Sequence, residues 1–390
     1  MNENWAAQEK FAELIRAEYQ RIEQMRRDTT VKDYSKQDQI IIGILPGDGI
    51  GPILMEQAIR VLRCLLKDEI ASGKVAIRHI EGMTIENRDA LGESLPEPIF
   101  EEMRKCDVLL KGPMVTPRAS EIAAGVYRHN LVSPNSLMRR RLGLFAAVRP
   151  IRIPEKGIDW TFFRENIEGE YIWGDKGIQV NEDLAVDFKV QTTLGSERIA
   201  RAALEYARRN GKKNVTVVTK ANIVKLTDGN FIKVVRKVGE EYPEIEIQER
   251  LVDAMAAKMM DPDFNKGMEV IVLPNLYGDI ITDVAAECQG GLGTAASSNV
   301  GNQYALFEAI HGTAPYLMQH GRGAYADPNS LIRAVGMMLA HIGYSDRKEK
   351  LDRALDICTV TERKKVVTTF AEGASAAEYT DYLLDTLAKL

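Results

Sequence analysis

Two aspartates, Asp279 and Asp283, follow a run of four apolar residues at Val270–Leu273. Such a run is typical of a buried parallel strand, and a helix is expected to begin at Asp279, with Gly278 in the turn before it. Residues four apart on a helix project from one face, where two carboxylates repel each other unless a cation lies between them. Oxygen ligands of this kind suit Mg²⁺ or Mn²⁺. The spacing therefore indicates a divalent metal site, although a solvated acidic helix N-terminus would show the same pattern.

Three arginines could supply the positive charge that an acidic substrate requires. Arg139 is expected on a helix, whereas Arg149 and Arg164 are expected near the ends of two strands. A guanidinium binds a carboxylate through two parallel hydrogen bonds and stays charged at neutral pH. Convergence of the three would suit a polyacid that also binds the metal, whereas any one of them alone could equally form a surface ion pair.

Secondary-structure elements must position these side chains. From Ile40 onward the chain alternates apolar runs with amphipathic stretches. The alternation predicts an α/β fold with a mostly parallel sheet. Strands are expected at residues 40–45, 74–80, 107–110, 160–163, 215–219, 245–248 and 269–273, and helices at residues 53–67, 196–209 and 331–341.

A glycine-rich turn follows the first of these strands. Gly47, Gly49 and Gly51 have a GxGxG spacing, which differs from the GxGxxG fingerprint of dinucleotide-binding Rossmann folds. No acidic residue ends a second strand about 20 residues later, where that fingerprint requires one. A conventional Rossmann site is therefore not expected.

The composition excludes several classes of protein. The chain has 390 residues, 45% of them hydrophobic and 27% charged, with a net charge of −5. These values are typical of a globular protein long enough for two domains, and the acidic balance argues against nucleic acid as a partner. No apolar run has the length needed to span a bilayer, so no membrane partner is expected. Four scattered cysteines without a CxxC pair are typical of a cytoplasmic protein with reduced thiols.

Residues 1–39 are expected to form a helical extension followed by a polar linker. Phe11, Leu14 and Ile15 begin a series of apolar residues at near-helical spacing among charged side chains. The stretch lacks the apolar core of a secretory signal, and its acidic residues argue against an organelle transit peptide. It would dock on the body of the protein or on a neighbouring subunit, or remain a frayed tail.

Three motifs resemble those of one family. They are residues 164–171 (RENIEGEY), residues 275–283 (NLYGDIITD) together with the glycines at 290–293, and residues 307–315 (FEAIHGTAP). Their types and order resemble the metal-dependent β-decarboxylating dehydrogenases of 2-hydroxy acids, the isocitrate/isopropylmalate dehydrogenase family. The resemblance extends from about Ile40 to the C-terminus.

The resemblance implies a particular architecture, with two α/β domains, a cleft between them and a cofactor site unlike the Rossmann one. Residues 40–144 and 290–390 would form the large, cofactor-binding domain. Residues 145–289 would form the smaller domain and carry the dimer contacts, including a β-rich clasp at about 169–192. The implied assembly is a homodimer or a higher homo-oligomer.

The resemblance also implies a role for each matching residue, and in the family the counterparts of Lys220 and Asp253 come from the partner subunit. Tyr171, Lys220 and Asp279 would be catalytic. Asp253, Asp279 and Asp283 would bind the metal. The substrate would be held by Ser133, Asn135, Arg139, Arg149 and Arg164, and the cofactor by Thr116, Asn222, Glu308, His311, Gly312, Thr313, Ala314, Pro315, Tyr316 and Asp327.

The chemistry implied by the resemblance needs these residue types. A bound Mg²⁺ or Mn²⁺ would lower the pKa of the substrate hydroxyl, and Lys220 with Asp279 would remove its proton as hydride leaves the same carbon. The β-keto acid formed would lose CO₂, and Tyr171 would supply a proton to the enolate carbon. Negative charge develops on oxygen throughout, where the metal and the arginines stabilise it.

The substrate is expected to be isocitrate, a 2-hydroxy polycarboxylic acid that would be converted to 2-oxoglutarate. Ser133 and Asn135 match the Ser-x-Asn of isocitrate members, whereas isopropylmalate members have leucines where this chain has Asn135 and Ser136. A buried isopropyl group would leave polar side chains unpaired. Pro134 and the loop at residues 118–132 depart from the isocitrate pattern, so 3-isopropylmalate, homoisocitrate and tartrate- or malate-type acids stay open.

The cofactor is expected to be NAD, with NADP as the alternative. The pair Tyr316-Leu317 and the segment at residues 366–373 lack the cations that a 2′-phosphate would need. Arg322, which lies between them in the chain, is the one residue that could supply such a cation.

Some relatives are non-catalytic regulatory subunits that keep the fold and lose active-site residues. Because the catalytic residues, aspartates and arginines are all present here, an active enzyme is favoured.

Overall fold

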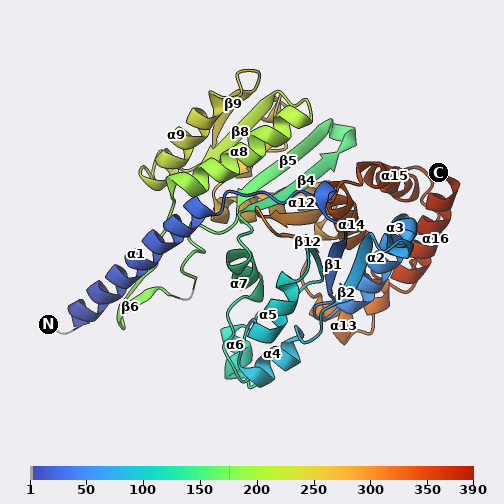
Figure 1. Cartoon of the computed structure of the whole chain (residues 1–390), viewed down its shortest axis with the longest axis horizontal. Coiled ribbons are helices and arrows are strands. Elements are labelled where there is room, and N and C mark those ends of the chain that lie inside the picture. Colours follow the sequence, from blue (N-terminus) through green and yellow to red (C-terminus); the bar gives the residue numbers. More distant parts are fainter. Residues whose placement is uncertain (1–2, 175) are drawn as a thin grey trace. The chain divides into compact units, whose positions relative to one another are not determined.

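The computed structural model describes residues 3–174 and 176–390, and the side chains of residues 3–6 and 292 lie outside the description (Figure 1). Residues 1 and 2 of the predicted extension and Asp175 of the predicted clasp are therefore not covered. The chain forms two compact units. The first contains the chain up to Val31 together with Gly143–Ala285, and the second contains Lys32–Leu142 and Ala286–Leu390. The predicted division at residues 144/145 and 289/290, the cleft and the domain roles stay predictions.

The first unit contains five neighbouring strands in the order β4-β5-β10-β8-β9. Strands β5, β10, β8 and β9 run parallel to one another, whereas β4 pairs with β5 in the antiparallel sense. A separate two-stranded ribbon, β6-β7, lies within the predicted clasp. The bounds are β4 Ala146–Ile153, β5 Ile158–Glu165, β6 Ile178–Asn181, β7 Leu184–Val186, β8 Asn214–Thr219, β9 Glu246–Leu251 and β10 Val270–Leu273.

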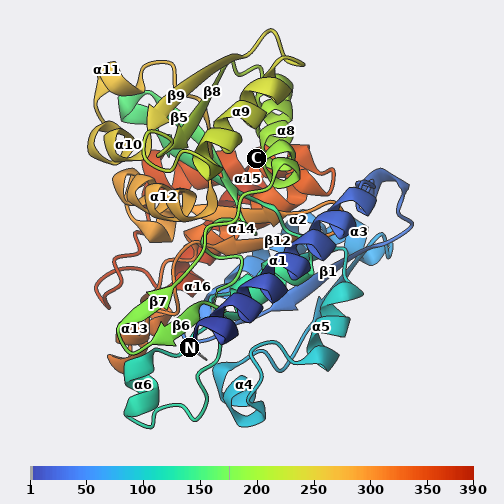
Figure 2. The same ribbon diagram turned by 90° about the vertical axis from the view of Figure 1, so that its left-hand side faces the viewer.

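Helix α8 (Thr193–Arg209) packs on this sheet through Ile199, Ala203 and Leu204, which are fully buried. Their spacing places them on one helical face, and burial of each large side chain contributes about 1.5–3 kcal/mol. Helix α1 (Glu3–Arg27) lies beside β6 in two views of the molecule (Figures 1 and 2). The other helices of this unit are α9 Thr227–Gly239, α10 Val252–Lys258, α11 Pro262–Asn265 and α12 Asn275–Gln289, which ends just beyond the unit.

The second unit has its own five strands, in the order β2-β1-β3-β12-β11. Strands β1, β3 and β12 are parallel, and β2 is parallel to β1, whereas β11 pairs with β12 in the antiparallel sense. The predicted α/β fold with mostly parallel strands is therefore confirmed. The bounds are β1 Ile40–Leu45, β2 Val75–His79, β3 Val108–Lys111, β11 Ala296–Val300 and β12 Ala305–Ala309.

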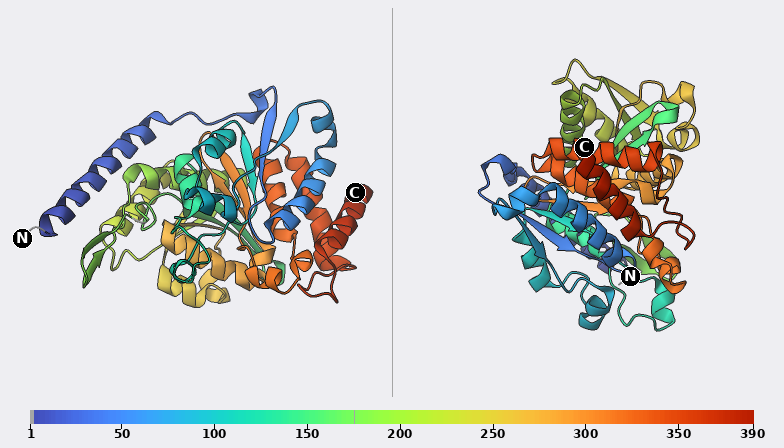
Figure 3. Two further views of the ribbon diagram at one scale, coloured as in Figure 1. Left: turned by 90° about the horizontal axis from the view of Figure 1, so that it is seen from below. Right: turned by 90° about the vertical axis from the view of Figure 1, so that its right-hand side faces the viewer.

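Helices α2 and α14 pack against each other in the core of this unit, and α16 lies beside α2 (Figure 3, red beside blue). No helix in the described part of the chain has the length and apolar character needed to cross a membrane. The helices are α2 Gly51–Leu65, α3 Lys67–Ala71, α4 Ile85–Leu91, α5 Glu97–Arg104, α6 Ala119–Ala123, α7 Pro134–Arg141, α13 Pro315–Gln319, α14 Asn329–His341, α15 Ser345–Asp356 and α16 Ala376–Lys389.

Candidate active site

Four parallel strands of the first unit end at the same edge of the sheet. Arg164 lies near the end of β5, Lys220 directly follows β8, Asp253 lies just after β9, and Asp279 lies on α12, which follows β10. The carboxyl ends of parallel strands are where ligands bind in open α/β sheets. The sheet therefore places four of the predicted catalytic, metal and substrate residues at one edge.

Helix α12 begins at Asn275, so the prediction of a helix starting at Asp279 was wrong. The amide of Gly278 donates to the carbonyl oxygen of Pro274 at 2.9 Å, which is a helical hydrogen bond. Gly278 therefore lies inside the helix instead of in a turn. A Cβ at this position would lie 2.6 Å from Cγ of Arg164, so the glycine lets the arginine pass close to the helix.

Asp279 is the centre of a charged cluster. One carboxylate oxygen of Asp279 forms a short ion pair with Nη1 of Arg164 and lies 3.7 Å from Nη2 of Arg149. The other accepts a hydrogen bond from the hydroxyl of Tyr171 at 3.0 Å. Arg149 lies in the middle of β4, so the prediction that it lies near a strand end was wrong, whereas Arg164 does lie near the end of β5. The side chains of Arg149 and Arg164 are 6% and 2% exposed, and both contact a carboxylate that is itself accessible.

Asp283 lies one helical turn after Asp279 and shares the same arginine. Nη1 of Arg149 binds Oδ1 of Asp283 at 2.9 Å and donates to the hydroxyl of Thr282 at 2.5 Å. Partial desolvation raises the pKa of Asp283, Arg149 opposes the rise, and the charge of Asp279 adds to it. The two carboxylates thus repel each other as the spacing predicted, and the two arginines relieve part of that repulsion.

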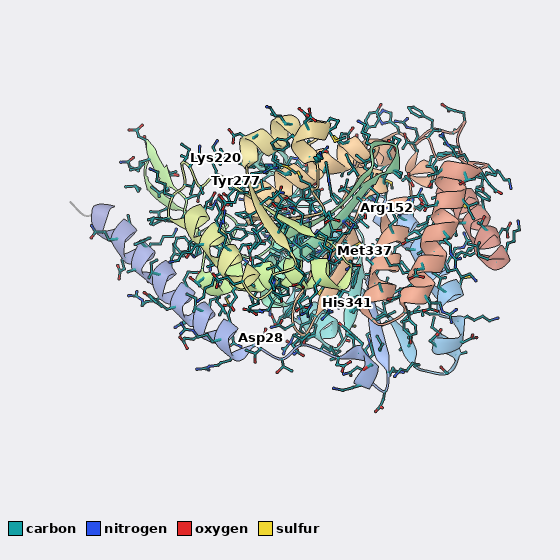
Figure 4. The ribbon with its side chains drawn as sticks, turned by 90° about the horizontal axis from the view of Figure 1, so that it is seen from above. Asp28, Arg152, Lys220, Tyr277, Met337 and His341 are labelled. Carbon is teal, nitrogen blue, oxygen red and sulfur yellow. The ribbon has the colours of Figure 1, made fainter. Side chains whose placement is uncertain are left out.

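Lys220 and Asp253 form a second ion pair, with 2.8 Å between Nζ and Oδ1. A hydrogen bond from Lys220 lowers the pKa of Asp253, whose side chain is 62% exposed. The main chain at Lys220 is fixed by the buried carboxylate of Asp228, which accepts from its amide at 2.8 Å. Lys220 is labelled in Figure 4 together with Tyr277, a residue of α12.

Asn275 belongs to the predicted motif at residues 275–283 but was given no role, and the sequence did not single out Asp228 or Lys189. Oδ1 of Asn275 accepts from Nε and Nη2 of Arg164 at 3.0 and 2.7 Å, which sets the direction of that guanidinium. Nζ of Lys189 lies 2.5 Å from Asp228 and 3.3 Å from Glu170, the residue before Tyr171. None of these contacts produces a periodic or spacing signal, because each joins segments far apart in the chain.

The donor set fits a hard divalent ion in part. Asp279 and Asp283 offer oxygen ligands one turn apart, as Mg²⁺ or Mn²⁺ prefers. Within the described residues no three His, Cys, Asp or Glu side chains come together in a way that could hold a metal. Asp253 instead pairs with Lys220. Two carboxylates of this chain could therefore bind a metal together, and further ligands would have to come from the substrate, water or another subunit.

The carboxyl edge of the second unit is built from main-chain turns. The amide of Asp48 donates to Pro113 at 2.7 Å, and the amide of Ile50 donates to Thr313 at 3.2 Å. These bonds join the glycine-rich turn, the turn containing Thr116, and the predicted cofactor segment His311–Pro315. Gly49 has a φ of +59°, and a Cβ there would lie 2.3 Å from the carbonyl oxygen of Thr313. Glycine is therefore required where the turns meet.

Glu308 anchors this edge with charge. Its carboxylate binds Nζ of Lys111 at 2.8 Å and Nη2 of Arg139 at 3.2 Å, and it accepts from Asn299 at 2.7 Å. Burial opposes ionisation, but Lys111 and Arg139 hold the pKa of Glu308 well below its usual range. Arg139, predicted to join Arg149 and Arg164, thus has a partner in its own unit.

Ser133 and Asn135 begin helix α7. The hydroxyl oxygen of Ser133 accepts from the amide of Ser136 at 3.4 Å, as an N-cap does, and a hydroxyl in this role can still donate. Oδ1 of Asn135 is buried and has no hydrogen-bond partner among the described residues. An unpaired buried oxygen of this kind is costly, so the site suits a polar ligand better than an apolar one.

The remaining predicted cofactor residues follow β12. Ala314 has a φ of +47°, which is rare for a residue with a Cβ and is found mainly at functional sites. Burial lowers the pKa of His311, whose Nδ1 lies 3.0 Å from the carbonyl oxygen of Gly312. Burial raises the pKa of Asp327, which accepts two hydrogen bonds from Asn329. Thr116, Asn222, Gly312, Pro315 and Tyr316 are exposed.

Arg322 lies against the ring of Tyr316. Its guanidinium carbon is 5.2 Å from that ring centre and 4.3 Å from the ring of Phe370. A cation therefore does lie beside the predicted cofactor segment.

Comparison with known proteins gives a consistent result. The family described as isocitrate/isopropylmalate dehydrogenase matches residues 41–383. The mitochondrial NAD isocitrate dehydrogenase subunit 2 of Schizosaccharomyces pombe is 36% identical over 89% of this chain and 87% of its own length. The 3-isopropylmalate dehydrogenase of Archaeoglobus fulgidus is 37% identical over 83% of this chain and 92% of its own.

The crystal structure of isocitrate dehydrogenase from Methylococcus capsulatus has a TM-score of 0.76 and 35% identity, covering 90% of this chain and 99% of that one. Relatives named for homoisocitrate and for NADP are found as well. The chain therefore belongs to the isocitrate/isopropylmalate dehydrogenase family, whose members are β-decarboxylating oxidoreductases.

Proposed function

We propose that this protein is an NAD-dependent isocitrate dehydrogenase that converts isocitrate to 2-oxoglutarate and CO₂ with Mg²⁺ or Mn²⁺. The observation that carries the proposal is the cluster around Asp279, where two buried arginines and the hydroxyl of Tyr171 meet one accessible carboxylate. A regulatory subunit would have no need of this arrangement.

The four unpaired cysteines are the basis for proposing a cytoplasmic location.

The residues of this chain would act in sequence on the bound acid. Arg149 and Arg164 would turn from the aspartates to carboxylates of the substrate, at little cost because both already hold carboxylate oxygens in this geometry. Lys220 from a second copy of the chain, with Asp279, would accept the proton of the substrate hydroxyl. Tyr171 would donate its proton to the carbon that has lost CO₂. A divalent ion bound at Asp279 and Asp283 would lower the pKa of the hydroxyl and stabilise negative charge on oxygen.

The choice of isocitrate rests on helix α7. Its first turn presents the hydroxyl of Ser133 and the unpaired Oδ1 of Asn135. The hydroxyl proton of Ser133 suits the extra carboxylate of isocitrate, whereas an isopropyl group would leave that proton without an acceptor. The choice of NAD rests on Tyr316, which stands where a cation would be expected for NADP. Arg322, close to the Tyr316 ring, is the residue that could reverse it.

A second copy of the chain would complete the site. Ile280 and Val284, which are the neighbours of the two metal aspartates on α12, are 54% and 39% exposed. Ile223 and Leu226, in the segment after Lys220, are 69% and 88% exposed. Large apolar side chains exposed beside catalytic groups favour an interface between subunits. The clasp at residues 169–192 would contribute to the same interface.

The test is a comparison of kcat/KM for isocitrate, homoisocitrate, 3-isopropylmalate and tartrate with NAD and with NADP. Isocitrate with NAD should be the best pair, and Ser133→Glu should reduce isocitrate turnover strongly by charge repulsion. A preference for 3-isopropylmalate would refute the assignment based on Ser133 and Asn135. A preference for NADP that Arg322→Ala abolishes would assign the 2′-phosphate to Arg322. Absence of turnover with every acid would favour the regulatory alternative.

A further inference from the structure

The N-terminal helix α1 precedes the part of the chain that the family shares, which begins at residue 41. It is nevertheless part of the first unit, where Leu14 is 8% exposed and packs in the hydrophobic core with Ile15 against it. The same unit contains Tyr171 and Asp279. The helix therefore lies within the body that holds the catalytic cluster, and the structure allows its contacts to be followed to that cluster.

The polar contacts of α1 fall on the segment that surrounds Tyr171. Arg21 binds the carboxylate of Glu168 at 2.8 Å. Glu18 accepts a hydrogen bond from Nε1 of Trp173 at 3.2 Å, and Arg21 also pairs with Glu18 at 2.8 Å. One helical face thus holds residues three before and two after the predicted proton donor.

Aromatic and main-chain contacts extend the same hold along the segment. The ring of Phe11 lies 5.1 Å from that of Phe188, which packs edge-on against Trp173 at 4.9 Å. Nζ of Lys10 donates to the carbonyl oxygen of Gly177 at 2.8 Å. The helix therefore contacts Glu168 and Trp173 beside Tyr171 through polar groups, and Gly177 and Phe188 further along the chain through a hydrogen bond and ring packing.

Glu168 is the residue through which the helix reaches the cluster. Its side chain is fully buried and also accepts from the amide of Thr192 at 2.8 Å. Its carbonyl oxygen accepts from Nδ2 of Asn275 at 2.9 Å. Oδ1 of Asn275 in turn orients Arg164, which pairs with Asp279. An unbroken chain of polar contacts therefore joins Arg21 to the carboxylate that binds Tyr171.

Removal of Arg21 would leave a buried anion without its ion-pair partner. A buried carboxylate that has lost its ion-pair partner is strongly destabilising, so the surrounding segment is expected to rearrange. Glu165, a second fully buried carboxyl group, lies close enough to Glu168 to interact with it electrostatically and cannot replace the lost positive charge. The segment carrying Tyr171 would then lose its fixed position.

We propose that α1 is a positioning element for Tyr171, with Arg21 as its principal anchor through Glu168. The inference rests on the proposed function, in which Tyr171 gives its proton to carbon. Arg21 acts on Tyr171 through Glu168, Asn275 and the segment between them, and it is a positioning residue in this sense. A displacement of about 1 Å at a reacting group can cost on the order of 100-fold in rate.

The test compares Arg21→Ala with Arg26→Ala, a matched change on the same helix whose arginine is 62% exposed and pairs only with nearby Glu23 among the described residues. Three quantities are measured on the full-length protein. They are the amide hydrogen exchange of residues 166–176, kcat and KM for isocitrate, and the enzyme-catalysed exchange of the carbon-bound protons of 2-oxoglutarate with D₂O in the presence of Mg²⁺. The last reports the proton-transfer step of Tyr171 without hydride transfer.

Arg21→Ala should speed amide exchange in residues 166–176 and lower both kcat and the carbon-proton exchange rate by about 10- to 100-fold, with KM changed less. Arg21→Lys should lie between the wild type and Arg21→Ala in all three, and Arg26→Ala should match the wild type. Should Arg21→Ala fail to fold, Arg21→Lys carries the same comparison.

Equal behaviour of the Arg21 and Arg26 variants would overturn the inference. Faster amide exchange with wild-type kcat would refute the positioning of Tyr171. If the wild type turned over none of the acids, the proposed function would fail. Independently of that result, wild-type rates of amide exchange in Arg21→Ala would refute the inference that α1 fixes the position of residues 166–176.

Discussion

Glu165 and Glu308 are both buried glutamates near the carboxyl edges of parallel strands, one in each unit. The pKa values of their side chains are shifted in opposite directions. Burial, reinforced by the neighbouring Glu168 carboxylate, raises the pKa of Glu165 to about 8. Burial acts in the same direction on Glu308, but Lys111 and Arg139 overcome it and keep that carboxylate ionised. The same residue type in the same kind of place is therefore neutral in one unit and an anion in the other.

The difference shows that partners, more than burial, decide the charge of a buried acid. In the first unit Arg149 and Arg164 are directed at the accessible aspartates of α12, and Arg21 pairs with Glu168. Glu165 accepts hydrogen bonds from the amides of Ile167 and Glu168, and the charge of Arg198 offsets its burial only in part. In the second unit Lys111 and Arg139 both form ion pairs with Glu308, and the edge beyond Glu308 consists of main-chain turns. The first edge therefore presents charged side chains, whereas the second presents main-chain turns beside a paired carboxylate. Four changes would break or sharpen this contrast.

The largest effect is expected for Asp279→Asn, which removes the charge that the first edge is built around. Arg164, Arg149 and the proposed metal would all lose their common carboxylate, so kcat should fall by at least about 10³-fold with the fold retained. Excess chelator should abolish wild-type activity in the same way. Glu287→Gln, an exposed site on the same helix, should change kcat less than about twofold. Full activity of Asp279→Asn, or in excess chelator, would refute the metal assignment.

A mixture of two inactive variants should recover activity if the first edge is completed by a second subunit. Tyr171→Phe and Lys220→Met are each expected to be inactive, and a hybrid dimer would contain one intact site. With random exchange at equal amounts, half the dimers are hybrids with one of two sites intact, so about a quarter of wild-type activity should return. The measurement is turnover before and after subunit exchange, with each variant alone as control. Demonstrated exchange without recovered activity would contradict a shared site.

Glu308→Gln should destabilise the protein by about 3–5 kcal/mol, because Lys111 would be left as a buried unpaired charge. Glu97→Gln, at an exposed ion pair with Arg141, should cost less than about 1 kcal/mol. Both values come from denaturant unfolding at pH 7.

The pH dependence of this difference has a definite sign. Because the folded pKa of Glu308 is depressed, its contribution is present above the unfolded pKa of about 4.5 and is lost as pH falls further. The gap between wild type and Glu308→Gln should therefore shrink by up to about 1.4 kcal/mol per pH unit below pH about 4.5. A gap that stays constant down to pH 3 would mean that Glu308 is not held ionised.

Glu165→Gln should show a pH dependence of the opposite sign. The raised pKa means that folded Glu165 keeps its proton above pH about 4.5, where the unfolded chain has lost it, so wild-type stability falls as pH rises toward 8. The variant lacks this titrating group. Its free energy of unfolding relative to that of the wild type should therefore rise by up to about 1.4 kcal/mol per pH unit across that window. Glu155→Gln, an exposed site, should gain nothing. If Glu165→Gln lost stability relative to the wild type between pH 5 and 8, Glu165 would be ionised in the fold.

Much of the fold and the family membership could be read from the chain alone. Apolar runs such as Val270–Leu273 have a local cause, since a buried parallel strand needs apolar residues on both faces. The strand Ile40–Leu45 has the predicted bounds, and the other predicted strands differ by a few residues at their ends. Strands β11 and β12 were not predicted, and β4, the strand that contains Arg149, was predicted without bounds. The motifs around Tyr171 and Asp279 identified the family because residue type and spacing are properties of the sequence. The roles of the individual site residues stay predictions.

Other properties were decided only when distant segments met. The position of Gly278 inside α12 depends on Arg164, more than 100 residues earlier, which fills the space a Cβ would need. Asn275 orients Arg164, and Arg21 pairs with Glu168, through contacts that leave no mark on local spacing. Nothing in the sequence around Glu165 and Glu308 indicates that one keeps its proton and the other does not. Electrostatic energy depends on distances in space, and those are set by the tertiary structure.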